Sequence, residues 1–93
     1  MDNQEYIVIL YDYYGELLSD KQREYFELYY FDNLSLQEIA DNHNISKNAV
    51  SKALKEAKNN LEYYESILKL IDNNNKIKNI LSEDVYLKIE KYI

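Results

Sequence analysis

The chain has 93 residues and a formal net charge of −6, so it is long enough for one domain and too acidic for a general nucleic-acid coat protein. It contains no cysteine, which excludes disulfides and thiolate metal sites. It also contains no proline and only one glycine, Gly15; helices tolerate both residue types poorly, so we expect a single all-α domain over residues 1–93.

The first predicted helix runs from about Gln4 to Leu18. Gly15 lies near its end, where it either weakens the last turn or permits a close contact with another helix. Apolar side chains recur along this segment at spacings of three, four and three residues, as expected for one buried face: Ile7, Leu10, Tyr14 and Leu17.

The second predicted helix, Asp20–Phe31, has Ser19 as its N-cap and an aspartate in its first turn. Asp32 and Asn33 are typical turn residues and are expected to end it. A helix with apolar side chains on more than one face should be buried on much of its circumference. This helix has five such residues: Tyr25, Phe26, Leu28, Tyr29 and Tyr30.

The segment Ser35–Leu54 has the spacing of a helix-turn-helix, a motif whose second helix enters the major groove of DNA. Ser35 and Glu38 form the pattern of a capping box. Asn44 stands where the turn needs a positive φ, and Ser46 can cap the second helix. We expect residues 18–57 to form the core of the domain. The alternative is a helical hairpin that packs a small core and binds no nucleic acid.

We expect a helix-turn-helix bundle of about five helices, in which the second helix of the motif is the fourth. This helix is predicted to be unusually long, from Lys47 to about Ile71. At about 1.5 Å per residue it would extend over roughly 35–40 Å. The outer half of its apolar stripe needs a partner, either the first and last helices of the same chain or the same helix of a second copy. The first helix has a matching stripe and could pair with it along much of its length, within a monomer or across a dimer. The stripe has the spacing of three heptads: Val50, Leu54, Ala57, Leu61, Tyr64, Leu68 and Ile71.

The polar run at residues 72–75, Asp-Asn-Asn-Asn, is expected to end the long helix. Residues 76–81 are too few to assign. Ser82 can cap a last helix, Glu83–Tyr92. The sequence shows no signal peptide, lipidation signal or apolar run long enough to span a membrane, so we expect a cytoplasmic protein with no membrane partner.

Charge is distributed unevenly along the chain. Residues 1–45 hold ten acidic and two basic side chains, a sum of −8, whereas residues 46–60 sum to +3 and residues 61–93 to −1. The basic segment coincides with the predicted recognition helix, as expected for a weak phosphate-binding surface, although ordinary solvation would also place lysines there. Lys58 would contact the nucleic-acid backbone at most. The predicted nucleic-acid-binding residues lie opposite the apolar stripe: Lys47, Asn48, Ser51, Lys52 and Lys55.

No pattern in the sequence indicates catalysis, a cofactor or a bound metal. A single glycine allows no glycine-rich phosphate loop, and no nucleophile stands beside a base. His43 is the only histidine, at a position of the motif that usually faces the core, so we expect a half-buried structural side chain. The chain is not expected to be an enzyme.

The segment Leu18–Ala57, LSDKQREYFELYYFDNLSLQEIADNHNISKNAVSKALKEA, resembles region four of bacterial sigma factors. More closely, LYDYYGELLSDKQREYFELYYFDNLSLQEIA and ISKNAVSKALKEAKNNLEYYESIL resemble the YlxM family of small bacterial helix-turn-helix proteins, over residues 10–70. The resemblance implies an all-α fold and a regulatory role in the signal recognition particle pathway. That link comes from gene neighbourhood in the family, and no residue of this chain carries it.

The chain departs from the family pattern at the start of the recognition helix. The family usually has arginine and glutamine after the capping serine, where this chain has Lys47 and Asn48. Lysine lacks the planar fork with which arginine reads guanine or clamps phosphate, which weakens the case for sequence-specific recognition. The Asn48 amide can still bond an adenine edge. His43 also stands where the family usually has an aromatic residue.

Two functions compete at this level. The first is a regulator that binds DNA or RNA through the recognition helix. The second is a protein-interaction adaptor whose acidic helices bind a component of the signal recognition particle. A homodimer through the long helix is compatible with both.

Overall fold

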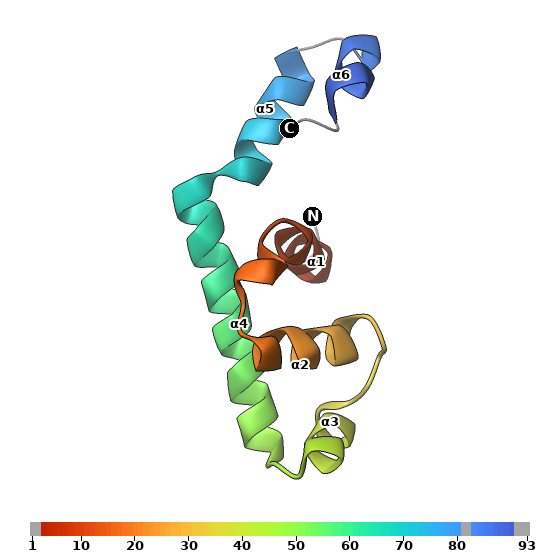
Figure 1. Cartoon of the computed structure of the whole chain (residues 1–93), viewed down its shortest axis with the longest axis vertical. Coiled ribbons are helices and arrows are strands. Elements are labelled where there is room, and N and C mark those ends of the chain that lie inside the picture. Colours follow the sequence, from red (N-terminus) through yellow and green to blue (C-terminus); the bar gives the residue numbers. More distant parts are fainter. Residues whose placement is uncertain (1–2, 81–82, 91–93) are drawn as a thin grey trace.

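The computed structural model describes residues 3–80 and 83–90, which form helices joined by short connections (Figure 1). No strand occurs in that part of the chain, and the expected all-α fold with a long fourth helix is confirmed. The elements in order are α1 (Asn3–Tyr14), the 3₁₀ helix η1 (Gly15–Leu17), α2 (Asp20–Tyr30), α3 (Leu36–His43), α4 (Lys47–Leu68), α5 (Leu70–Ile80) and α6 (Glu83–Ile89).

Helix α4 is the central helix, against which the other helices of the body pack. Helices α1, α2 and α3 pack against it along its length, while α5 and α6 continue beyond its C-terminal end as an arm (Figure 1). The molecule measures 50 × 24 × 22 Å, and its radius of gyration of 16.0 Å exceeds the ~13 Å typical of a compact chain of this size. The arm therefore extends beyond the body instead of folding onto it.

The core of the body consists of two apolar clusters joined at Leu54, whose half-buried side chain packs against both. The first cluster lies where α1, α2 and the middle of α4 meet, and α5 adds Ile71 to it. Its buried members are Ile7, Leu10, Tyr14, Leu18, Phe26, Ala57, Leu61 and Ile71. The second lies inside the helix-turn-helix and contains Tyr25, Ile39, Ala40 and Val50.

The first helix ends earlier than the sequence suggests. Backbone α-helical geometry stops at Tyr14, and the chain tightens into η1 from Gly15. A 3₁₀ helix has about three residues per turn, so the apolar register shifts. As a result Leu17, predicted in the buried stripe, is 55% exposed, and Leu18 is buried instead. The prediction for Leu17 is wrong for this reason.

The predicted end of the long helix is also wrong. Helix α4 stops at Leu68 because Lys69 adopts a left-handed conformation, φ 54° and ψ 33°, and residues 72–75 lie inside α5. The Glu65 carboxylate accepts hydrogen bonds from the backbone N–H groups of Ile71 (3.1 Å) and Asp72 (3.2 Å), so it caps the new helix. The Tyr14 hydroxyl accepts the N–H of Leu70 at 3.1 Å and donates to Glu65 at 2.5 Å.

The heptad stripe of the long helix is mostly used within the chain. Val50, Ala57 and Leu61 are fully buried against the other helices, whereas Leu68 is 47% exposed. Helix α1 does not pair with α4 along its length: it crosses it, and is seen nearly end-on where α4 runs vertically (Figure 1). One short crossing supplies a partner for the middle of the stripe and leaves the last turns of α4 uncovered.

The last helix begins where predicted, at Glu83, and the structure describes it as far as Ile89. The expected cap at Ser82 and the end at Tyr92 lie outside the described residues.

Candidate nucleic-acid interface

Local hydrogen bonds set the geometry of the helix-turn-helix. The Ser35 hydroxyl accepts the N–H of Glu38 at 3.1 Å, and the Glu38 carboxylate accepts the N–H of Ser35 at 3.0 Å, which completes the capping box at the start of α3. Asn44 has φ 55° and ψ 43° and ends the helix. Ser46 then accepts the N–H of Ala49 at 3.0 Å. All three predicted caps are confirmed.

The packing of the motif fixes which face of α4 remains free. Ile39, Ala40 and Val50 have no exposed surface, and the ring of Tyr25 covers them from α2. The small side chain of Ala40 lets α3 approach α4 closely. Because Val50, Ala57 and Leu61 are held inside, the opposite side of the same helix must face solvent.

All five predicted binding residues are exposed on α4: Lys47, Asn48, Ser51, Lys52 and Lys55. At about 100° per residue, Asn48, Lys52 and Lys55 lie opposite the buried face, while Lys47 and Ser51 lie on its flank. Within the described residues, Lys47, Lys52 and Lys55 form no ion pair, whereas Lys58 pairs with Glu62 at 3.9 Å.

The site is electrostatically distinct from the rest of the molecule. Three exposed lysines with no carboxylate partner among the described residues stand on the N-terminal half of α4, and one of them, Lys47, lies in its first turn at the positive pole of the helix dipole. An anion at that first turn would meet the Lys47 ammonium group and the first backbone N–H groups of α4 together. The arrangement can bind phosphate, and Asn48 adds an amide that can bond a base edge.

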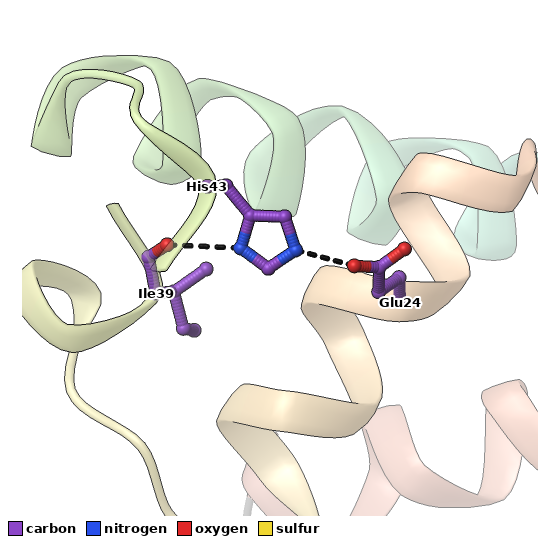
Figure 2. Close-up of polar contacts among 3 residues, drawn as sticks. All are labelled: Glu24, Ile39 and His43. Carbon is purple, nitrogen blue, oxygen red and sulfur yellow. Dashed lines mark hydrogen bonds and ion pairs between the residues drawn. The ribbon is translucent and has the colours of Figure 1, made fainter. Parts of the chain in front are cut away.

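His43 ties α3 to α2 behind this face. Its Nδ1 lies 3.0 Å from the carbonyl oxygen of Ile39, and its Nε2 bonds the Glu24 carboxylate (Figure 2). Its ring meets that of Tyr25 edge-on at 5.0 Å. The Glu24 carboxylate and the Ile39 carbonyl raise the pKa of His43, and His43 lowers the pKa of Glu24. The expected half-buried structural role is confirmed.

Sequence reasoning missed a cleft beside the recognition helix. Lys58, treated as a backbone contact at most, lies at its α4 wall, and the cavity has a volume of about 520 Å³. Asn33, at the end of the cleft that follows α2, has a left-handed φ of 59°. The sequence identified it only as a turn residue. The remaining lining comes from Gln4, Ile7, Tyr29, Tyr30 and Leu34. Only the meeting of α1, α2 and α4 creates this space.

In the part of the chain that the structure describes, no three His, Cys, Asp or Glu side chains are placed to hold a metal ion. None of the described helices is long and apolar enough to cross a membrane.

Comparison with known proteins agrees with this geometry. Residues 1–91 match the family UPF0122, "Putative helix-turn-helix protein, YlxM / p13 like". A UPF0122 protein of Caldanaerobacter subterraneus is 45% identical over 90 residues, 97% of this chain and 70% of the relative. One of Malacoplasma penetrans is 46% identical over 84 residues, 90% of this chain and 74% of the relative. The family description names no enzyme. The chain therefore belongs to the UPF0122 family of YlxM/p13-like helix-turn-helix proteins.

Proposed function

We propose that this protein is a regulator that binds double-helical nucleic acid through the exposed face of α4. One observation carries the proposal: Lys47, Lys52 and Lys55 are exposed and form no ion pair with any described residue, on a helix whose opposite face is buried in the core. An α-helix fits the roughly 12 Å wide major groove of B-DNA, and this helix has its N-terminal half uncovered on the polar side.

The charge balance sets the expected strength of binding. Three lysines that neutralise about three phosphates give a slope of log K against log salt near −2.7 on duplex DNA. The net charge of −6 opposes any wider contact with a polyanion, so the interface is confined to α4. Non-specific affinity should lie in the range of about 10⁻⁴–10⁻⁶ M at physiological salt.

Charge reversal on α4 tests the proposal. We expect Lys47→Glu with Lys52→Glu to weaken binding of a fluorescent duplex at least tenfold in an anisotropy titration at low salt. The control is Lys76→Glu with Lys88→Glu, which changes the net charge equally but lies on the arm. An equal loss in both double variants, or no binding by the unchanged protein at low salt, would contradict the proposal.

The nature of the nucleic acid is a separate question that the same assay answers. The family resemblance directs attention to the signal recognition particle, so its RNA, a duplex RNA and a duplex DNA belong in the titration. Tighter binding of the particle RNA than of unrelated RNA duplexes would place this regulator in the protein-targeting pathway. Equal affinities would leave it a general duplex binder.

A protein-interaction adaptor is the second candidate function. It is favoured by the −8 charge over residues 1–45, which leaves exposed carboxylates such as Asp12 and Glu16 on the α1 side of the body. In a pull-down with particle components, the adaptor requires that Asp12→Lys with Glu16→Lys abolish capture while the α4 lysine variant binds normally. The opposite pattern supports the nucleic-acid interface.

A further inference from the structure

We infer that the cleft beside Lys58 is a pocket for one unpaired nucleobase at the edge of the nucleic acid held by α4. This inference rests on the proposed function and names the form of its ligand: a duplex with a single-stranded extension. The volume of about 520 Å³ lies within the range of about 300–1,000 Å³ that small-molecule pockets occupy.

The position of the cleft continues the basic flank of α4. At about 100° per residue, Lys47, Ser51 and Lys58 fall within one narrow sector of the helix, with Lys55 beside it. From Lys47 to Lys58 the helix rises roughly 16 Å. One nucleic-acid strand covers that distance in about five nucleotides at 3.4 Å each. A strand that follows this flank from the duplex therefore arrives at the cleft.

The lining of the cleft suits a base. Tyr29 is 36% exposed, and its ring stands nearly perpendicular to that of Tyr30 at 5.0 Å. Tyr30 in turn packs on the buried Phe26 at 4.4 Å, so the tyrosine pair rests on the core. Aromatic faces bind unpaired bases of any identity by stacking. The Asn33 amide at the rim offers both a donor and an acceptor to a base edge.

The turn that carries Asn33 is held in place. The backbone N–H of Leu34 donates to the carbonyl of Leu28 at 3.0 Å, and asparagine tolerates the left-handed φ of 59°. Lys58 has only a long ion pair with Glu62, 3.9 Å between charged atoms, and both side chains are about half exposed. Its ammonium is thus able to turn toward a phosphate.

Charge distinguishes this cleft from two others. The cleft at Gly15 is lined by three carboxylates, Asp12, Glu16 and Glu27, against one cation, Arg23. The cleft at the α4–α5 junction is lined by Glu65 and Asp72 against Lys69. Among the described residues that line the cleft beside Lys58 there is no carboxylate, and the one charged group is that lysine. A polyanionic ligand is therefore better matched in charge to this cleft than to the other two.

The test compares a blunt duplex with the same duplex carrying a five-nucleotide overhang that contains 2-aminopurine, in DNA and RNA versions. We expect the overhang to raise affinity about fivefold or more and the 2-aminopurine fluorescence to be quenched on binding. Tyr29→Ala should abolish both effects and leave blunt-duplex affinity unchanged, whereas Tyr29→Phe should retain them. The DNA and RNA versions show which backbone the pocket accepts.

Two further variants test whether the effect is specific to the cleft. Tyr63→Ala removes an exposed tyrosine on α4, away from the cleft, and should change neither the gain in affinity from the overhang nor the quenching. Asn33→Gly removes the amide at a position whose φ suits glycine, and should reduce differences among the four overhang bases. Equal affinity for blunt and overhang ligands, or quenching that survives Tyr29→Ala, overturns the inference alone. Failure of every ligand to bind overturns the proposed function with it.

Discussion

At the scale of single residues, the contact between His43 and Glu24 makes the joint between α2 and α3 dependent on pH. The raised pKa of His43 means that its contribution to stability is complete below its ordinary value of 6.5 and is lost as the pH rises through the raised pKa. The lowered pKa of Glu24 means that its contribution is complete above 4.5 and is lost as the pH falls through the lowered pKa. The pair therefore stabilises the fold most between about pH 4.5 and 6.5.

We predict that His43→Gln lowers the free energy of unfolding more at about pH 5.5 than at about pH 8.5, because the ion pair exists only with a protonated imidazole. Urea unfolding followed by circular dichroism measures the difference. In a Glu24→Gln background the same substitution should lose most of its pH dependence, because only the bond to the Ile39 carbonyl still favours the protonated imidazole. A difference that is constant over this range would show that the charge on His43 contributes nothing.

Gly15 is the second residue with a specific consequence. A β-carbon at this position would lie 2.8–3.0 Å from ring carbons of Tyr11, whose ring is stacked on Phe26 at 4.3 Å. We predict that Gly15→Ala destabilises the protein by about 1–3 kcal/mol, the usual cost of overpacking, although alanine normally favours a helix. Chemical denaturation measures it. Combined with Tyr11→Ala, the substitution should cost much less, and an equal cost in both backgrounds would contradict the steric explanation.

At the scale of the elements, the sequence predicts those features that are determined by residues close together in the chain. Ser19, Ser35 and Ser46 cap their helices as expected because each bonds an N–H three residues away. The left-handed turn at Asn44 likewise depends on residues of its own segment. The five polar residues of α4 could be placed on the outside because helix periodicity alone puts them away from the side that carries Val50.

Features that depend on distant parts of the chain could not be predicted. The break at Lys69 depends on Tyr14, whose hydroxyl contacts Leu70 across 56 positions in sequence. Burial and the Glu65 carboxylate raise the pKa of Tyr14 from 10 to about 12, so this hydroxyl remains a donor even in alkaline solution near pH 10. The base-sized cleft likewise forms only where three helices come together, and the periodicity of one segment cannot predict such a contact.

Lys69 gives a prediction at this scale. A non-glycine residue in the left-handed region costs about 1–2 kcal/mol, and glycine avoids that cost while losing more entropy on folding. We therefore expect Lys69→Gly to raise the free energy of unfolding by roughly 0.5–1 kcal/mol, measured with urea. Lys69→Ala, which removes the charge but keeps the β-carbon, is the control. A gain with alanine equal to that with glycine would assign the effect to the side chain and not to the backbone.

At the scale of the whole molecule, the described residues of the arm include apolar side chains that are exposed to solvent. The buried stripe of α4 is occupied within the chain, so a homodimer through that stripe would have to unpack the core. Exposed apolar residues occur on several helices, and seven of those described lie on the last turns of α4 and on the arm: Tyr63, Ile67, Leu68, Leu70, Ile80, Val85 and Leu87.

We predict that two copies associate through these residues, since exposed apolar surface concentrated on one part of a molecule marks protein contacts. Sedimentation velocity over a series of micromolar concentrations should show a monomer–dimer equilibrium. Ile67→Glu with Ile80→Glu should leave a monomer of unchanged helix content. A monomer at every concentration for the unchanged protein would contradict this prediction and leave the nucleic-acid interface untouched.

Both functional proposals for nucleic-acid binding depend on the exposed face of α4 being the surface that binds a polyanion. The most direct test is a chemical-shift titration of the isotope-labelled protein with a short nucleic-acid duplex at low salt. The account predicts that the amide signals of Lys47, Asn48, Ser51, Lys52 and Lys55 move most, while those of the arm stay in place. Shifts concentrated on α1 or α5, or no shifts at all, would contradict it.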